Sequence, residues 1–386
     1  MQFDAPSGAL ERASGVMASV YRFVFLLFAV YCTGISQVLA QDIIWYDATD
    51  FEIEGKGWVD TANPFDRLPE SAQNKISSTA WRMSKNNAGI AIRFVTDADV
   101  VNVRWSLTLE SLAMPHMAAT AVSGVDLYTR YADNTWWFVG NGRPHKADDN
   151  YAVFKFSDSA MLQRECLLYL PLYNGIKSLE IGVPVDANIE LPATRPESLR
   201  KPLVVYGTSI TQGACASRPG MAWTNILGRL LDRPVINLGF SASGSMEPPI
   251  AEVLAELEPA AYVIDCTWNM GDSAEVYLDR TSQLVQTLRE VHPVIPIFFV
   301  GQSFIHPEAH PTSLSQRQEA AVKHMQERGV EGLIFVPGED LIGSDGEGTV
   351  DEVHLNDLGM DRMARYLYHV IRDFLTVPAT APETMP

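Results

Sequence analysis

The sequence predicts an α/β fold, in which a three-layer sandwich with a parallel five-stranded sheet is preceded by an antiparallel β-sandwich. From residue 202 onward, short apolar runs alternate with segments whose apolar residues recur at helical spacing, as in a parallel sheet covered by helices. Before residue 190 the runs are short, rich in β-branched and aromatic residues, and separated by turn dipeptides, which is typical of an antiparallel sandwich. The length of 386 residues also favours two domains over one.

Residues 1–40 have the pattern of a signal peptide. Residues 23–31 form an apolar stretch, and Val-Leu-Ala at 38–40 satisfies the small-residue rule for cleavage before Gln41. We therefore expect an exported protein, periplasmic or secreted. The apolar stretch is short for a membrane span, so an uncleaved anchor is the less favoured alternative.

Residues 41–190 are expected to form the β-sandwich. Asn86-Asn87, Asn141-Gly142 and Asn174-Gly175 are the turn signals that separate its runs. Strands are expected at 91–95, 100–105, 135–139, 151–154, 165–170 and 178–183. The Pro-rich stretch at 191–201 predicts a linker.

Residues 202–376 are expected to form the parallel sheet and its helices, and the Pro/Thr-rich tail at 377–386 is expected to be disordered. Strands are predicted at 203–206, 235–238, 261–265, 296–300 and 333–336. Helices are predicted at 222–231, 250–257, 274–292, 314–329 and 358–374.

Composition excludes several kinds of partner. Hydrophobic residues make up 47% of the chain and charged residues 20%, which indicates a globular protein. Lys and Arg number 29 against 47 Asp and Glu, for a net charge of -18. Since an acidic surface repels phosphate backbones and anionic lipid heads, we expect no nucleic-acid partner and no stable membrane association once the leader is removed.

Ser209 follows the predicted strand at 203–206 through a tight turn that contains Gly207. Open α/β sheets place their chemistry at the carboxyl ends of strands, where a helix start offers free backbone N–H groups. Such a serine could be a nucleophile. Taken alone, a helix N-cap is its commoner role.

Asp351 and His354 could supply what a nucleophilic serine needs. A serine hydroxyl requires a general base, and the base requires a carboxylate that holds its tautomer. The two residues are three apart in a turn-rich segment before the predicted helix at 358–374, so both can reach one site. An Asp and a His at this spacing also occur by chance, as a solvated acid and a capping histidine.

Gly239 and Asn269 follow two further predicted strands, at 235–238 and 261–265. A glycine there can present its N–H without a side chain in the way, and an asparagine can aim its amide at the same point. With the N–H of Ser209 they would form an oxyanion hole of three donors. A turn glycine and an Asx-turn asparagine are the alternative roles.

These four segments, in this order, resemble the SGNH or GDSL-type hydrolase superfamily. Carried over position by position, the resemblance implies that Ser209, His354 and Asp351 form the catalytic triad, and that Ser209, Gly239 and Asn269 form the oxyanion hole. It also implies a flavodoxin-like sheet.

The resemblance covers about residues 200–375 and has two departures. Thr208 stands where the family has the Asp of Gly-Asp-Ser, which is not a triad member. Of the family's Gly-x-Asn-Asp block, only Asn269 remains.

Residues 124–128 read Gly-Val-Asp-Leu-Tyr and match the Gly-x-Asp-Leu-Tyr motif of a β-domain fused to one branch of these hydrolases. The resemblance implies a jelly-roll-like sandwich. A structural role for Asp126 and Tyr128 is favoured over a functional one.

Beyond the leader the chain has three cysteines, Cys166, Cys215 and Cys266, which allow at most one disulfide. Cys215 and Cys266 could be neighbours, although free buried thiols are the favoured alternative. No Cys and His spacing suits zinc, so we expect no metal and no cofactor.

Together these features predict an exported serine esterase that hydrolyses short-chain O-acyl esters. The expected substrate is a small acylated molecule, most simply an O-acetylated carbohydrate. A lipase or lysophospholipase, which would need a larger acyl pocket, is one alternative. The other is a carbohydrate-binding protein whose hydrolase domain is inactive, against which the intact Ser209, Asn269 and His354 count. The sequence leaves the oligomeric state open.

Overall fold

The computed structural model describes residues 42–157, 163–304 and 306–375. The predicted signal peptide at 1–40 and the predicted tail at 377–386 lie outside the described residues. From Ile44 on, the described chain belongs to one compact unit. None of the helices in the described ranges is both long enough and apolar enough to span a bilayer.

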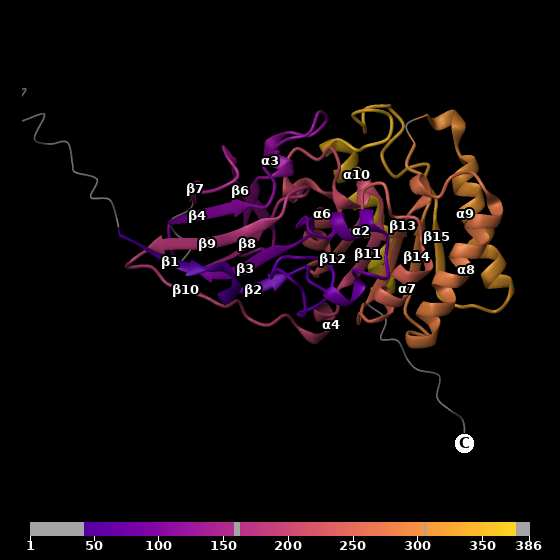
Figure 1. Cartoon of the computed structure of the whole chain (residues 1–386), viewed down its shortest axis with the longest axis horizontal. Coiled ribbons are helices and arrows are strands. Elements are labelled where there is room, and N and C mark those ends of the chain that lie inside the picture. Colours follow the sequence, from indigo (N-terminus) through magenta and orange to yellow (C-terminus); the bar gives the residue numbers. More distant parts are fainter. Residues whose placement is uncertain (1–41, 158–162, 305, 376–386) are drawn as a thin grey trace, which may run out of the picture. The chain divides into compact units, whose positions relative to one another are not determined.

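A parallel sheet forms the centre of the C-terminal half. Its strands are β11 (Leu203–Gly207), β12 (Val235–Gly239), β13 (Ala261–Asp265), β14 (Ile297–Val300) and β15 (Leu333–Val336). They lie side by side in the order β12-β11-β13-β14-β15, with every pair parallel (Figure 1). This is the flavodoxin-like order that the resemblance implies. In such a sheet the ligand crevice lies at the carboxyl ends of the strands beside the switch point, here between β11 and β13.

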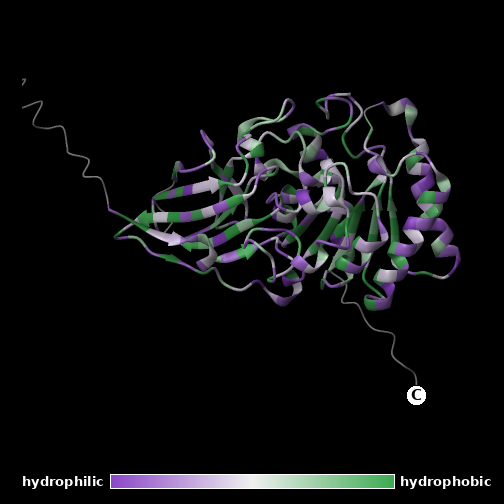
Figure 2. Ribbon diagram, in the orientation of Figure 1, coloured by the Kyte–Doolittle hydropathy of each residue, from purple (hydrophilic) through white to green (hydrophobic). Residues whose placement is uncertain are grey.

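Helices cover both faces of the parallel sheet. They are α6 (Trp223–Leu231), α7 (Pro248–Ala255), α8 (Ala274–Val291), α9 (Ser313–Glu327) and α10 (Asp357–Leu375). Side chains of one strand face, such as Val205 and Phe298, share a core with α6 and α10. The alternate side chains, such as Val204 and Phe299, share a second core with α7, α8 and α9. The strands are accordingly hydrophobic, while the helices have polar outer faces (Figure 2). The predicted three layers are confirmed.

The N-terminal half consists of two antiparallel sheets. One has the order β1-β9-β4-β7, and the other has the order β10-β3-β8-β5-β6 with β2 paired to β3. The strands are β1 (Ile43–Asp47), β2 (Glu52–Glu54), β3 (Ala91–Thr96), β4 (Val100–Leu107), β5 (Val125–Arg130), β6 (Trp136–Gly142), β7 (Asn150–Lys155), β8 (Arg164–Tyr169), β9 (Ile176–Pro184) and β10 (Ile189–Glu190). Trp105, Phe94 and Leu127 belong to one buried core shared by strands of both sheets. The predicted sandwich is confirmed.

Several details differ from the sequence-based prediction, and strands β1, β2, β5 and β10 were not among the predicted strands. Asn141-Gly142, predicted as a turn, forms the end of β6, where it pairs with Val125 and Asp126 of β5. The predicted linker contains a short helix, α4 (Glu197–Arg200). Two other short helices, α2 (Ser78–Met83) and α3 (Ala119–Val122), also have no counterpart in the prediction.

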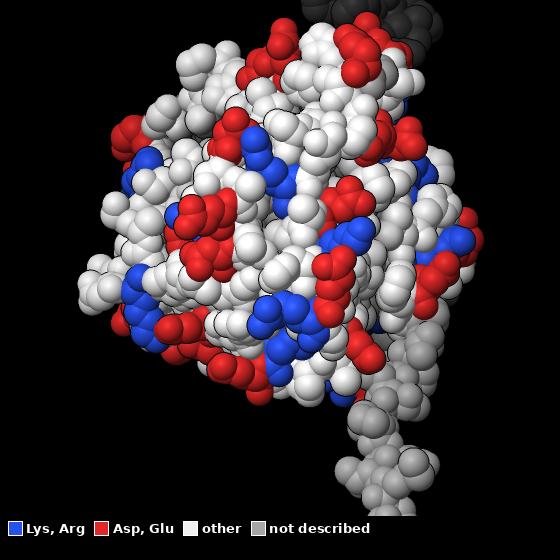
Figure 3. Space-filling view, turned by 90° about the vertical axis from the view of Figure 1, so that its right-hand side faces the viewer, with Lys and Arg blue, Asp and Glu red and all other residues white. Residues whose placement is uncertain are grey.

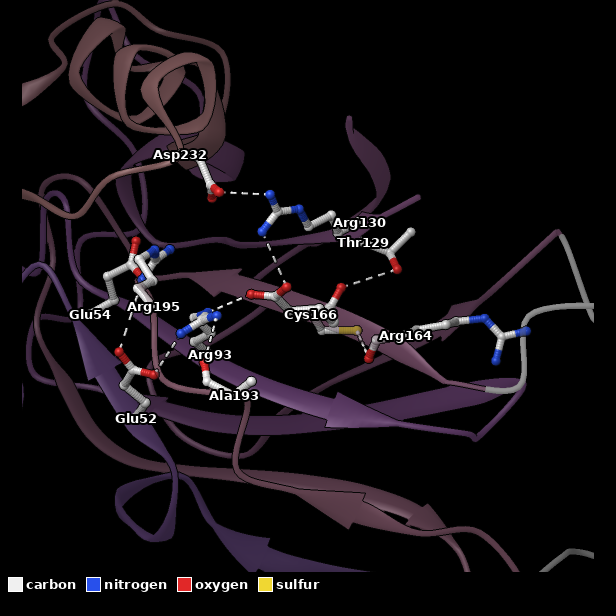
Figure 4. A network of polar contacts seen from close by, with 11 residues as sticks. Glu52, Glu54, Arg93, Thr129, Arg130, Arg164, Cys166, Ala193, Arg195 and Asp232 are labelled. Atoms are coloured by element: carbon white, nitrogen blue, oxygen red, sulfur yellow. Dashed lines mark hydrogen bonds and ion pairs between the residues drawn. The ribbon is translucent and has the colours of Figure 1, made fainter. Parts of the chain in front are cut away.

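A buried ion pair and a hydrogen bond from a buried arginine hold the predicted linker against the sandwich. Arg195 donates to Glu54 of β2 at 2.6 Å, and Arg93 of β3 donates to the carbonyl oxygen of Ala193 at 3.2 Å (Figure 4). The same network reaches helix α6, because Arg130 of β5 pairs with its C-cap residue Asp232 at 2.7 Å. The segment is thus fixed in place by charged side chains.

The Gly-x-Asp-Leu-Tyr motif also holds the two halves together. Asp126 is fully buried and accepts from Arg218 at 2.9 Å and from the N–H of Gly220 at 2.8 Å. Arg218 donates to the hydroxyl of Tyr128 at 2.6 Å, and a side chain at position 220 would collide with the Tyr128 ring. These contacts agree with a structural role for Asp126 and Tyr128.

Candidate active site

The turn after β11 places Ser209 at the first position of helix α5 (Ser209–Gln212). Thr208 is the N-cap residue, and its hydroxyl accepts from the N–H of Ile210 at 3.3 Å. Glycine is required at 207, because a Cβ there would collide with Thr211. Since Thr208 is the cap, the hydroxyl of Ser209 is available for another partner. Thr208 therefore provides local turn support in place of the family's Asp.

That partner is His354. The Oγ of Ser209 lies 3.0 Å from Nε2 of His354, and Nδ1 of His354 lies 2.8 Å from Oδ2 of Asp351. A donor at Nδ1 leaves Nε2 as the acceptor of the serine proton, which is the arrangement that general-base activation needs. The structure thus brings three of the predicted residues into one hydrogen-bonded chain.

Backbone groups hold the carboxylate in place. Oδ1 of Asp351 accepts from the N–H groups of His354 at 2.8 Å and Val353 at 3.2 Å. Burial raises the pKa of Asp351, but the hydrogen bonds from the His354 ring and from these N–H groups bring it below its ordinary value. Asp351 is therefore ionised at neutral pH, as a partner of an imidazolium must be.

The loop that carries the histidine is closed on itself. The N–H of Val350 donates to the carbonyl oxygen of His354 at 2.8 Å, and Thr349 and Leu355 form a β-bridge. Asn356 donates to the carbonyl oxygen of Glu347 at 2.6 Å. These bonds fix the loop immediately before α10.

Asn269 brings an unpaired donor to the carboxyl end of β13. It ends the 3-10 helix η4 (Thr267–Asn269), and its Nδ2 is buried with no hydrogen-bond partner among the described residues. A buried amide without a partner is costly, and a ligand oxygen at this strand end would complete its bonding. The N–H of Ser209 is similarly left over, because the first N–H of a helix has no acceptor within it.

The structure does not support the predicted role of Gly239 as a donor to the oxyanion. Its N–H donates to Oδ1 of Asn237 at 2.9 Å, which leaves it unavailable to an oxyanion. Glycine is required there for another reason, since a Cβ would collide with the backbone nitrogen of Gln212. Gly239 therefore lets α5 pack directly on the end of β12. The sequence held a signal for this, because Asn237 is a polar residue in an otherwise apolar strand.

Residues from the N-terminal half support this part of the site. The buried guanidinium of Arg67 donates to the carbonyl oxygens of Asn237 at 3.0 Å and Gly239 at 2.8 Å, and burial lowers its pKa to about 9. Gln212 donates to Oδ1 of Asn86 at 3.1 Å and accepts from the N–H of Ser241 at 3.0 Å. These residues could not be predicted from the sequence, because nothing in their local pattern indicates contacts with a distant strand.

His116 was also missed. Its ring centroid lies 5.7 Å from that of His354, with the planes tilted by 34°. Cys215 donates from Sγ to the carbonyl oxygen of His116 at 3.4 Å. Burial, together with nearby Asp351, raises the pKa of the Cys215 thiol to about 11, so it is not a competing nucleophile. A loop of the sandwich therefore reaches His354.

The remaining predictions concern thiols and metals. Cys166, Cys215 and Cys266 are all buried and free, so Cys215 and Cys266 do not form a disulfide. Within the described ranges, no group of His, Cys, Asp and Glu side chains is placed to hold a metal ion.

A parallel sheet with this site defines the class of SGNH-type ester hydrolases. The model of the GDSL-like lipase/acylhydrolase family matches residues 200–372, and that of the N-terminus of SGNH hydrolase-type esterases matches residues 43–189. A solved structure from Bacteroides ovatus, described as a GDSL-like lipase, is 33% identical with a TM-score of 0.78, and the match covers 87% of this chain and 99% of that one. The chain belongs to the GDSL-like lipase/acylhydrolase family and is an ester hydrolase.

Two other solved structures share the fold. A salicylyl-acyltransferase from a tetracycline biosynthetic pathway is 16% identical with a TM-score of 0.67, over 89% of this chain and 98% of that one. A family two carbohydrate esterase from Cellvibrio japonicus is 10% identical with a TM-score of 0.56, over 87% of this chain and 98% of that one. None of the curated proteins compared matches the chain.

Proposed function

We propose that this protein is an exported serine esterase that removes short acyl groups, most simply acetyl, from a carbohydrate. The observation that carries the proposal is the chain from Ser209 Oγ through His354 to Asp351, with distances of 3.0 Å and 2.8 Å. Asn269 stands at the neighbouring strand end with an unpaired amide. A nucleophile, a base and a donor for developing charge are the parts that acyl transfer needs.

In the proposed mechanism, Nε2 of His354 takes the proton of Ser209 as Oγ attacks the ester carbonyl carbon. Asp351 stabilises the imidazolium that results. As the tetrahedral intermediate collapses, His354 gives the proton to the departing alcohol oxygen and an acyl-enzyme remains. Water, deprotonated by His354, then attacks the acyl-enzyme, and the acid and free Ser209 are released.

Two donors for the oxyanion are the N–H of Ser209 and the amide of Asn269. A third candidate replaces Gly239. The turn after β12 holds Ala242 at a φ of 59°, a left-handed conformation that is unusual for alanine, and its N–H has no acceptor among the described residues. The neighbouring N–H of Ser241 is bonded to Gln212 of α5, so this turn lies against the helix that Ser209 begins. We assign the third donor to Ala242.

Three observations support the carbohydrate and the export. Carbohydrate esterases are among the proteins that share this two-part fold. Residues 1–40 have the pattern of a signal peptide. The net charge is -18, and on the side of α8 and α9 basic residues are interspersed with acidic ones, without a continuous basic surface (Figure 3). A neutral polysaccharide is compatible with such a surface.

Acetate release from partially acetylated xylo-oligosaccharides tests the proposal. The wild-type protein should release acetate, and Ser209→Ala should lower kcat by about 10⁴-fold or more, because the acyl-enzyme cannot form. Ser178→Ala, at an exposed position of the sandwich, is the matched control and should retain full activity. A wild-type protein that hydrolyses only long-chain esters would refute the proposed substrate.

A further inference from the structure

A cavity of about 650 Å³ lies in the N-terminal half, outside the catalytic triad. Its lining includes the charged residues Asp66 and Arg82 and the apolar residues Leu109 and Met114. Tyr173 also contributes to the lining. The size is within the range of small-molecule sites, which is about 300–1,000 Å³.

The cavity adjoins the active site at two places. The hydroxyl of Tyr173 donates to the carbonyl oxygen of Ser209 at 3.3 Å, so a lining residue contacts the nucleophile's own backbone. Met114 and Met117 exchange backbone hydrogen bonds of 3.0 and 3.1 Å, which makes a tight turn. Met114 lines the cavity on this turn, while His116 on the same turn contacts the ring of His354.

The lining fits a ligand that has both apolar faces and hydroxyl groups. Asp66 is held by Lys85 at 2.7 Å, and Lys85 in turn lies 3.8 Å from the centre of the Trp81 ring, so this wall is ordered. Arg82 reaches the cavity with no ion-pair partner among the described residues. Charged and amide groups can form hydrogen bonds with sugar hydroxyls. An acyl chain would instead displace the water bound to these groups and offer no hydrogen bonds in its place.

We propose that this cavity binds the glycosyl part of the substrate, the alcohol from which Ser209 removes the acyl group. The inference rests on the proposed function and deepens it. The sandwich then contributes to substrate recognition: its cavity holds the sugar, and the turn at Met114–Met117 contacts both the cavity and His354. Leu109 and Arg82 become specificity-determining residues.

The test uses two variants of the cavity, Leu109→Trp, which reduces its volume, and Arg82→Ala. They are compared with the control variant Leu191→Trp. Leu109 is 48% exposed and Leu191 is 63% exposed, so Leu191→Trp is a matched control outside the cavity. For each protein, kcat/KM is measured with partially acetylated xylo-oligosaccharides, p-nitrophenyl acetate and p-nitrophenyl octanoate. The first two variants should lower the ratio of oligosaccharide to acetate ester by about tenfold, mainly through KM, and Leu191→Trp should leave it unchanged.

Calorimetry provides a readout that does not need catalysis. Ser209→Ala should bind the same oligosaccharides, and adding Leu109→Trp should weaken that binding by about tenfold. This separates the two claims, since a wild-type protein without deacetylase activity would refute the proposed function, while the binding data would still decide the role of the cavity. The inference would be overturned if Leu109→Trp changed neither the affinity for the oligosaccharides nor the ratio of kcat/KM between oligosaccharide and acetate ester. A selective loss of octanoate hydrolysis would also overturn it, because that loss would assign the cavity to an acyl chain.

Discussion

Asn269 is the clearest residue-scale feature beyond the triad, because its amide nitrogen is buried and unpaired in the described structure. If it stabilises the oxyanion, its effect belongs to the transition state. We expect Asn269→Ala to lower kcat by roughly 10²- to 10³-fold with little change in KM. Steady-state kinetics on p-nitrophenyl acetate measure both constants. A rise in KM at unchanged kcat would make Asn269 a substrate-binding residue instead.

The buried carboxyl group of Asp265 makes the free energy of unfolding depend on pH. It is 2% exposed, accepts from the hydroxyl of Thr211 at 2.7 Å, and has its pKa raised to about 6 by burial. An unfolded aspartate has a pKa near 3.9. Because the folded pKa is the higher one, the stability contributed by the neutral carboxyl is full below pH ~4 and is lost as pH rises through ~6.

Asp265→Asn should remove that loss. Between pH 4 and 7 the wild-type protein loses on the order of 3 kcal/mol of unfolding free energy from this group, and the variant should not. Urea denaturation at several pH values measures the difference between the two. Asp60→Asn, at an exposed carboxylate, controls for the loss of one negative charge. If the free energy of unfolding changed with pH equally in the wild type and in Asp265→Asn, Asp265 would not be the source of the loss.

How far the sequence predicts the site depends on where each partner lies. Ser209, Asp351 and His354 could be predicted, because strand ends and a short loop carry them. The role of Gly239 could not, since it depends on the side chain of Asn237 and on close packing with Gln212.

At the scale of elements, long and periodic segments were predictable and short ones were not. The five strands of the parallel sheet and helices such as α8 lie close to their predicted bounds. Strands β2 and β10 are only a few residues long and are defined by pairing with β3, so their own sequences are too short for an alternating pattern to predict a strand. Asn141-Gly142 was misassigned for a related reason, since pairing with β5 overrides a turn-forming dipeptide.

The linker network allows an element-scale prediction of stability. Glu54 and Arg195 are both largely buried, with side chains 10% and 6% exposed. Glu54→Gln removes the nearer charged partner of the Arg195 guanidinium, since Glu52 lies 4.0 Å from it, and we expect it to lower the free energy of unfolding by about 2 kcal/mol. Urea denaturation measures this, and activity per folded molecule should not change.

The matched control is Glu180→Gln. Glu180 pairs with Arg104 on the surface, where the side chains are 34% and 45% exposed. Screening by water limits such a pair to at most about 1 kcal/mol. Equal losses in the two variants would mean that the linker network adds no more than an ordinary surface pair.

At the scale of the whole molecule, the N-terminal half makes direct contacts with the residues around Ser209 and His354. Arg67 holds the end of β12, His116 contacts His354, and Asp126 is bonded to Arg218 and Gly220. The cavity beside these contacts is lined by residues of the N-terminal half. The Gly-x-Asp-Leu-Tyr motif marks the contact of Asp126, but no motif indicates the contacts of Arg67 and His116, because they join residues far apart in the chain.

The central claim is that Ser209 forms the acyl-enzyme. Treatment with a fluorophosphonate, followed by intact mass spectrometry and peptide mapping, tests it most directly, because the reagent forms a stable covalent adduct with an activated serine. We expect a single adduct on the peptide that contains Ser209 and none in Ser209→Ala. An adduct at another residue, or unchanged labelling of Ser209→Ala, would contradict it.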